Sequence, residues 1–338
     1  MTASGTLILL DPHPRTEAMV YDADTAAGFA RMGRVVTHFG SRAPDALVEP
    51  LLPDVTVIVG QTPMPKDRLD RAPKLRAIVN VKGNWEPNVD YAAAQARGIH
   101  VLSVAPAMAP AVAEYCLGQA IALARGLNRA DTLFRSGREA YGISGNLAAY
   151  SLLGADVSIL GYGNLGRALV PMLRPFGCRI SVHDPWISDG FLRSEGVVPV
   201  DLEAALSSAR FLFLLAGVTV GNEGGLDRTR LSLIRRDATV ILASRAEIVD
   251  FGAFLELAAA GCFRAGVDVF PKEPVDAWDP IRGAPNILFS SHLAGGMELS
   301  YALLREMLLD DIGQIVRGLP PLRMQRADPN LAPMMRSR

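Results

Sequence analysis

The stretch that decides the fold is Asp156–Trp186, DVSILGYGNLGRALVPMLRPFGCRISVHDPW. It begins with a short apolar run that suits a buried strand, passes through the glycine pattern G-x-G-x-x-G, and then takes on helical character. A second apolar run, Cys178–Val182, ends next to Asp184. This order forms the dinucleotide-binding pattern: a strand, a glycine turn, a helix, and a second strand that ends in an acidic residue.

Each glycine of this pattern has a physical role. Gly161 allows the tight turn from strand to helix, Gly163 lets a pyrophosphate approach the backbone, and Gly166 allows helix and strand to pack closely. The free N–H groups and the positive dipole at the start of the helix favour phosphate groups. Asp184 can accept both ribose hydroxyls and repels a 2′-phosphate, so the sequence favours NAD over NADP. The alternative interpretation is an ordinary glycine-rich turn in a parallel sheet.

Composition limits the classes of function. The chain has 338 residues, enough for two domains, with 49% apolar and 20% charged residues, as in globular proteins. The net charge of −1 gives no bulk attraction to nucleic acid or anionic membranes. The N-terminal apolar run stops at Asp11 and is expected to be a strand rather than a signal peptide, and no segment of membrane-spanning length is expected. The isolated Cys116, Cys178 and Cys262 predict free thiols in a reducing cytoplasm and no metal site.

The first 105 residues alternate apolar strands and helices. Strands are expected at 6–10, 34–39, 55–59, 77–81 and 99–102, and helices at 16–31, 46–52, 66–72 and 90–97. This alternation predicts a parallel sheet covered by helices on both faces, in a small flavodoxin-like domain.

The second half continues the same alternation. Strands are expected at 197–200, 211–215, 239–243, 265–269 and 287–289, and helices at 165–176, 201–208, 228–233 and 250–260. Long helices are expected at 109–125 and 297–317, and 127–150 is expected to be an irregular arm. The predicted fold class is α/β, with two parallel-sheet domains, one Rossmann-like and one flavodoxin-like.

Three strand ends in this half carry one ionisable residue each: Arg245, Glu273 and His292. Ligands of open α/β sheets lie beyond the carboxyl ends of the strands. An arginine can hold a carboxylate through two parallel bonds, a histidine can transfer a proton near neutral pH, and a neighbouring glutamate favours the imidazolium. Together the three predict interconversion of a 2-oxo acid and a 2-hydroxy acid. Singly, each has a simpler interpretation, as a surface ion pair, a turn carboxylate and a capping residue.

The loop KGNWEP follows the strand that ends at Val81. Gly83 lets its backbone come close to a ligand. Trp85 either forms an apolar wall beside the substrate or packs within its own domain. Lys82 is the only lysine of the loop, so a phosphorylated substrate, which would need several cationic contacts, is disfavoured.

Over essentially its whole length the sequence resembles the D-isomer-specific 2-hydroxyacid dehydrogenases. The matching segments are VAEYCLGQAIALAR at 112–125, LGYGNLG at 160–166, HDP at 183–185, ASRAEIVD at 243–250, GVDVFPKEP at 266–274 and SSHLAGG at 290–296. The resemblance implies a catalytic set of Arg245, Glu273 and His292. A histidine rather than a glutamine at position 292 argues against the formate dehydrogenase branch.

The motifs above and the resemblance together give the expected binding residues; the backbone amides around 81–83 and the place of Asp268 come from the resemblance. Those expected for the substrate are Val81, Lys82, Gly83, Trp85 and Arg245, with backbone amides around 81–83 holding the carboxylate. Those expected for NAD are Gly161, Gly163, Asn164, Leu165, Gly166, Asp184, Ala243, Ser244 and Asp268, the last beside the nicotinamide carboxamide.

Domain division and assembly follow from the same resemblance. It implies a substrate domain of residues 1–105 plus 296–338, a nucleotide domain of residues 106–295, and a homodimer joined through the nucleotide domain and the arm. Three departures from the usual pattern leave the chemistry intact: Ala246 for glycine, Ser291 for proline and the segment 221–225. A fourth, the bulky loop 84–87, leaves the identity of the acid open. The alternative function on this fold is an NAD(H)-sensing binding protein, similar to a corepressor; the intact Arg–Glu–His set favours the enzyme.

Overall fold

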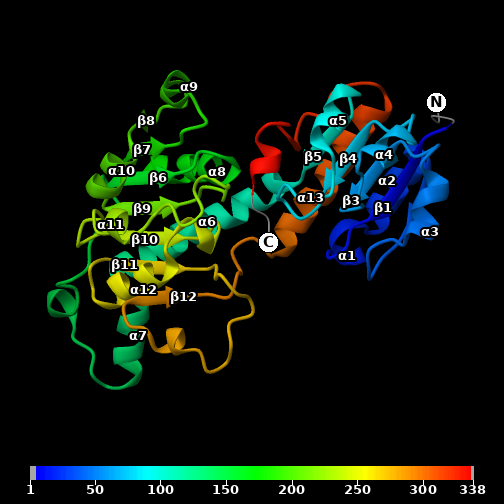
Figure 1. The fold of residues 1–338 in the computed structure, drawn as a ribbon. Coiled ribbons are helices and arrows are strands. Elements are labelled where there is room, and N and C mark those ends of the chain that lie inside the picture. Colours follow the sequence, from blue (N-terminus) through cyan, green and yellow to red (C-terminus); the bar gives the residue numbers. More distant parts are fainter. Residues whose placement is uncertain (1–4, 336–338) are drawn as a thin grey trace. The chain divides into compact units, whose positions relative to one another are not determined.

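The computed structural model describes residues 5–335. The chain divides into two compact units, 1–109 with 296–338 (unit 1) and 110–295 (unit 2) (Figure 1). The first boundary therefore falls at 109/110 rather than at the expected 105/106. Helix α6, Ala105–Arg125, runs continuously across it, and Ala107 packs in the core of unit 1 whereas Ala113 packs in that of unit 2.

Within residues 5–335, unit 1 is built on a sheet of six strands in the order β13-β5-β4-β3-β1-β2. Strands β1 to β5 are mutually parallel, and β13 pairs antiparallel with β5 at the edge. Strands β1, β3 and β4 are buried along their whole length, as expected of a parallel sheet with both faces covered. The order of β1 to β5 is flavodoxin-like. The bounds are β1 Leu7–Asp11, β2 Arg34–Thr37, β3 Val57–Gly60, β4 Ala77–Asn80, β5 His100–Ser103 and β13 Gln325–Arg326.

The helices of unit 1 differ from prediction near the N-terminus. The single helix expected over 16–31 is wrong: two helices form, α1 and α2. The break occurs because the Asp22 side chain accepts a hydrogen bond from the Thr25 amide and caps the second helix. The bounds are α1 Glu17–Val20, α2 Ala23–Met32, α3 Asp45–Val48, η1 Glu49–Leu51, α4 Lys66–Asp70, α5 Tyr91–Ala96, α13 Glu298–Val316 and η6 Ala332–Met334.

Unit 2 holds a parallel sheet of seven strands, counted over the described chain, in the order β12-β11-β10-β9-β6-β7-β8. Counted from β6, this is the Rossmann order 3-2-1-4-5-6 with a seventh strand added. The predicted fold class, α/β with two parallel-sheet domains, is confirmed. The bounds are β6 Asp156–Leu160, β7 Arg179–His183, β8 Val198–Pro199, β9 Phe211–Leu214, β10 Thr239–Leu242, β11 Arg264–Val267 and β12 Ile287–Phe289.

Two predictions for the helices of unit 2 need correction. The helix after the glycine turn ends as an α-helix at Leu173 and continues as a short 3-10 turn at Arg174–Phe176, where Pro175 breaks the α-helical bonding. The arm 127–150 is not wholly irregular, because it begins with α7, which lies apart from the strands of unit 2 in Figure 1. The bounds are α7 Leu127–Arg135, η2 Gly142–Gly145, α8 Asn164–Leu173, η3 Arg174–Phe176, α9 Asp189–Ser194, α10 Leu202–Ser208, α11 Arg228–Leu231, η4 Ala246–Ile248, α12 Phe251–Ala259 and η5 Pro280–Gly283.

Helix α6 also corrects the expectation that no segment reaches membrane-spanning length. The helix has 21 residues, and an 18-residue window within it has a mean hydropathy of 1.3, so it meets that criterion by length and composition only. Half of the apolar window is buried, with Cys116, Ala120 and Ala124 in the core of unit 2. A core helix of a globular domain meets the same criterion, because it is apolar on most sides.

Candidate active site

The glycine turn follows β6 and has the geometry that a dinucleotide requires. Gly161 has φ +93°, and a Cβ there would lie 2.5 Å from Cα of Ala216. A Cβ on Gly166 would lie 2.6 Å from the carbonyl oxygen of Gly161, so both positions demand glycine. At the exposed Gly163, no atom of the described residues beyond its two chain neighbours lies within 4 Å of the Cβ position. This opening leaves room for a pyrophosphate against the backbone.

Helix α8 and Asp184 complete the nucleotide-binding elements. In the part of the chain that the structure describes, no side chain caps α8 at Gly163, so the helix N-terminus and its dipole can serve a phosphate. Asp184 follows β7, and its two oxygens accept hydrogen bonds from the amides of Tyr162 (2.7 Å) and Trp186 (2.9 Å). Each oxygen retains a second lone pair for a ribose hydroxyl. The residues present therefore fit a dinucleotide of the NAD(P) type.

The remaining predicted cofactor residues lie along the same edge of the sheet of unit 2. Asn164 and Leu165 open α8, and Ala243 and Ser244 directly follow β10, where both are buried. The Ser244 hydroxyl donates to the carbonyl of Leu214, 3.0 Å away, which ties the ends of β9 and β10 together.

Arg245 stands beyond the end of β10 and is half-buried. Its Nη1 donates to the carbonyl of Ser244 at 2.7 Å, which orients the guanidinium. Burial lowers the pKa of Arg245 from its usual range, while the negative charges of Glu247 and Glu273 oppose that shift. An arginine nonetheless stays protonated at neutral pH, so this position offers a partly desolvated positive charge to an anionic ligand.

Glu273 and His292 form a direct pair. Nδ1 of His292 lies 2.7 Å from Oε2 of Glu273, and Oε1 of Glu273 accepts the amide of Phe270 at 3.0 Å. The pair is open to solvent, with 47% of the His292 side chain and 36% of the Glu273 side chain exposed. With Nδ1–H donated to the carboxylate, Nε2 is the nitrogen that can exchange a proton with a ligand.

The backbone of His292 is held by Asp268, which is fully buried. His292 has φ 55°, in the left-handed region, and its amide donates to the carbonyl of Asp268 at 2.8 Å. The Asp268 carboxylate accepts the Ser290 hydroxyl (2.6 Å) and the amides of Leu293 (2.9 Å) and Ala294 (3.1 Å). Asp268, expected beside the nicotinamide, is therefore also the anchor of the turn that carries His292, which the sequence reasoning missed.

Unit 1 carries the predicted substrate loop after β4. Trp85 is only 6% exposed and lies edge-on to Tyr91, with ring centroids 6.4 Å apart, in the core of this unit. Of the two interpretations left open for Trp85, this position favours packing of the indole within its own domain. The Val81 side chain is also buried, while Gly83 has φ +86°. Lys82 pairs with Glu86 at 2.5 Å, so its charge is already matched.

One residue beside this loop was not singled out from the sequence. Arg15 follows β1, and its Nε donates to the carbonyl of Val81 at 3.2 Å while Nη1 donates to the Tyr301 hydroxyl at 3.2 Å. No local motif marks Arg15, because the contact joins segments far apart in the sequence.

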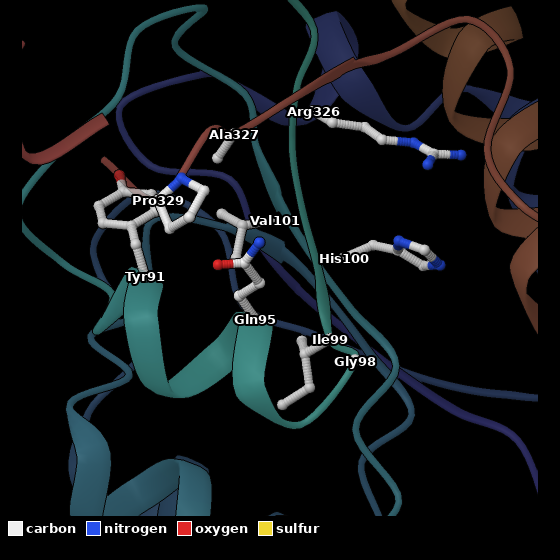
Figure 2. Close-up of a pocket in the computed structure, with 9 residues that line it drawn as sticks. All are labelled: Tyr91, Gln95, Gly98, Ile99, His100, Val101, Arg326, Ala327 and Pro329. Atoms are coloured by element: carbon white, nitrogen blue, oxygen red, sulfur yellow. The ribbon is translucent and has the colours of Figure 1, made fainter. Parts of the chain in front are cut away.

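Unit 1 also contains a cavity of about 240 Å³ between α5, β5 and the segment after β13. In Figure 2 the side chains of Tyr91, Gln95 and Val101 gather on one side of β5, whereas those of His100 and Arg326 project away from them. As far as the described residues show, its lining contains none of the predicted site residues. The cavity is therefore separate from the candidate site.

Three features together define a dinucleotide-binding protein: a Rossmann sheet, a glycine turn that fits a pyrophosphate, and an acidic residue at the end of the second strand. The Glu273–His292 pair and Arg245 add groups for proton transfer and anion binding. A family model described as D-isomer specific 2-hydroxyacid dehydrogenase, NAD binding domain, matches residues 117–294, more than half of the chain. The protein belongs to this family, whose activity is NAD(P)-dependent dehydrogenation of 2-hydroxy acids.

Named relatives agree with this assignment. A glyoxylate reductase of Korarchaeum cryptofilum is 26% identical over 273 residues, covering 79% of this chain and 81% of that protein. The crystal structure of a phosphoglycerate oxidoreductase from Rhizobium etli is 35% identical, with a TM-score of 0.86 over 96% of this chain and 98% of that one. An NADPH-dependent glyoxylate/hydroxypyruvate reductase from Sinorhizobium meliloti, solved with NADP and malonate, shares the fold at 22% identity, with a TM-score of 0.69 and 99% of each chain covered.

Proposed function

We propose that this protein interconverts a small 2-oxo acid and the corresponding D-2-hydroxy acid with NAD(H). The observation that carries the proposal is the 2.7 Å contact between Nδ1 of His292 and Oε2 of Glu273. Arg245 stands close enough to Glu273 for their charges to interact, in the unit whose glycine turn fits the dinucleotide. Membership of the family supports the reaction class.

Each of the three residues has a separate role in this reaction. When bound, the nicotinamide supplies a hydride to the carbonyl carbon of the acid. Arg245 binds the acid and polarises its keto oxygen. His292 donates the proton on Nε2 to that oxygen as the C–O π bond breaks, and in the reverse direction it accepts this proton. Glu273 holds the ring through Nδ1 and stabilises the imidazolium.

The coenzyme that we propose is NAD(H) rather than NADP(H). The Asp184 carboxylate is fixed by the amides of Tyr162 and Trp186, so it cannot readily turn away from a 2′-phosphate. Like charges at such short range disfavour the phosphorylated coenzyme. The relatives include a protein solved with NADP, so this choice rests on Asp184.

For the acid we propose an unphosphorylated compound. Lys82 is matched by Glu86, which removes the cation that its loop would have offered to a phosphate. A phosphorylated acid is the second candidate, because a relative with 35% identity is named a phosphoglycerate oxidoreductase. Parallel kinetics with glyoxylate, hydroxypyruvate and a phosphorylated 2-oxo acid decide between them through kcat/KM.

We also propose that the protein acts as a homodimer in the cytoplasm. The arm and its neighbourhood present apolar side chains with more than half of their surface exposed, which suits contact with a second copy. Its cysteines are free thiols, as a reducing compartment would keep them. Sedimentation of the native protein and of a variant with a charge in the arm tests the dimer. The exposed side chains are Leu127, Phe134, Tyr141, Ile143 and Leu147.

The direct test is a screen of NADH oxidation against a panel of 2-oxo acids. Turnover that is lost in His292→Ala is the expected result. Tight NADH binding without turnover of any acid would reject the enzyme and favour the NAD(H)-sensing alternative.

A further inference from the structure

Gln119 is a buried polar residue that the proposed reaction does not use. It lies on α6 and is 5% exposed, next to helix residues Cys116 and Ala120 in the core of unit 2. Among residues 5–335 its Oε1 has no hydrogen-bond partner, and this atom lies 2.6 Å from where a Cβ on Gly266 would stand. Leaving a buried amide oxygen unpaired costs free energy of folding, because the oxygen loses its hydrogen bonds to water. An apolar side chain would avoid this cost, so the amide calls for an explanation.

The other end of the amide provides that explanation. Nε2 of Gln119 donates to Oγ of Ser290 at 3.2 Å, and Oγ of Ser290 lies 2.6 Å from Oδ1 of Asp268. A hydroxyl has one proton to donate, and an ionised carboxylate only accepts. The Ser290 proton therefore points to Asp268, and the oxygen of Ser290 accepts from Gln119. The result is a directed chain of bonds from α6 to Asp268.

Asp268 is in turn the anchor of the turn 290–294. Its carboxylate and carbonyl accept one hydroxyl and three backbone amides from this turn, on both sides of His292. His292 itself is in the left-handed region, a backbone conformation that is unfavourable for a residue with a side chain. Such a conformation persists only where the surrounding bonds enforce it.

We propose that Gln119 is a positioning residue for His292. By donating to Ser290 it keeps the Ser290 hydroxyl directed at Asp268, and this holds the turn in the geometry in which His292 meets Glu273. Gln119 touches neither His292 nor Glu273 and acts through Ser290 and Asp268. The kinetic consequence rests on the proposed function, whereas the structural consequence does not.

The first test compares two identical substitutions. Gln119→Leu should lower kcat for 2-oxo acid reduction about tenfold and change the Kd for NADH little, because the turn loses its order while the glycine turn and Asp184 stay intact. Gln314→Leu is the matched control: Gln314 lies on α13 of unit 1, and its Oε1 is also buried without a hydrogen-bond partner in the described part of the chain. It should leave kcat unchanged. Equal kcat values for Gln119→Leu and the unmodified protein would overturn the proposal.

The second test asks whether Gln119 acts through Ser290. Ser290→Ala should itself lower kcat, and Ser290→Thr, which keeps the hydroxyl, should restore most of it. Adding Gln119→Leu to Ser290→Ala should cause little further loss, because contacting residues in one network are not additive. Losses that multiply in the double variant would mean that Gln119 acts independently of Ser290, against the proposal.

The third test needs no turnover. The chain has five histidines, so the ring signals of His292 can be resolved by NMR and assigned with a His292→Ala variant. Gln119→Leu should shift or broaden the His292 signal and leave those of His100 and His183 in place. An unchanged His292 signal contradicts the positioning role even if no acid is ever turned over. A changed signal in a protein without turnover upholds it while the proposed function fails.

Discussion

Trp85→Ala should destabilise unit 1 and leave substrate selection largely unchanged. The indole is 6% exposed, and its edge-to-face contact with Tyr91 spans 6.4 Å between ring centroids. Truncating a buried tryptophan costs about 3–5 kcal/mol, and the aromatic pair accounts for about 0.5–1.5 kcal/mol of stabilisation beyond area burial. At about 2–4 °C per kcal/mol for a domain of 150–250 residues, the melting temperature of unit 1 should fall by roughly 6–20 °C.

The assay is thermal unfolding followed by circular dichroism, run beside steady-state kinetics on the same preparation. Trp278→Ala is the matched control, because Trp278 is 95% exposed in unit 2 and the same atoms are removed. Its melting temperature should equal that of the unmodified protein. The ratio of kcat/KM between glyoxylate and phenylpyruvate should change less than tenfold in Trp85→Ala, or by less than about 1.4 kcal/mol in the difference between the two barriers.

The opposite pattern would refute the reasoning. A Trp85→Ala protein with an unchanged melting temperature and a ratio shifted more than tenfold would mean that the indole faces the acid. The core position of the ring would then be wrong, and the loop after β4 would select the substrate by size.

Three further predictions concern the chemistry. Arg245→Ala should abolish turnover with little change in NADH affinity measured by fluorescence titration, since the guanidinium serves the acid; a variant that keeps most of its kcat/KM would exclude this role. Glu273→Gln should lower kcat for 2-oxo acid reduction and leave NADH affinity unchanged, because it removes the carboxylate that holds the His292 ring through Nδ1. An unchanged kcat would dissociate Glu273 from the reaction. NADH should bind more tightly than NADPH, and Asp184→Ala should narrow the gap between the two dissociation constants; equal constants in the unmodified protein would contradict the role of Asp184.

The architecture was predictable because its signals are local. A short apolar run followed by a glycine turn marks the end of a buried strand, and the repeated alternation of strands and helices marks a parallel sheet. The predictions failed where a single side chain, or one contact between residues far apart in the sequence, determines the local structure. The Asp22 cap on Thr25 splits a helix that its composition allows to continue. Strand β13 has two residues, and their pairing with Leu102 and Ser103 of β5 makes it a strand.

The identities of the site residues could be predicted from the sequence, but the contacts between their side chains could not. Parallel topology alone brings the ends of β10 and β12 to the same edge of the sheet, so Arg245 and His292 could be grouped from sequence. The partners of neighbouring side chains could not be inferred. Lys82 turns to Glu86 four residues on, and Trp85 turns inward to Tyr91, because loop backbones without a repeating pattern leave side-chain direction undetermined.

Two separate anchors fix His292, and they differ in kind. Glu273 holds the ring from a position 36% exposed, where water can replace a lost partner. Asp268 holds the backbone from a fully buried position, where the amides of Leu293 and Ala294 would otherwise lack an acceptor. Loss of Glu273 should therefore free the His292 ring while the backbone of the turn stays in place. Loss of the Asp268 carboxylate should disturb the turn itself. A left-handed histidine has no sequence signature, since its conformation comes from a strand end more than 20 residues earlier; the position of the reactive ring is thus a property of the sheet and not of the SSHLAGG segment alone.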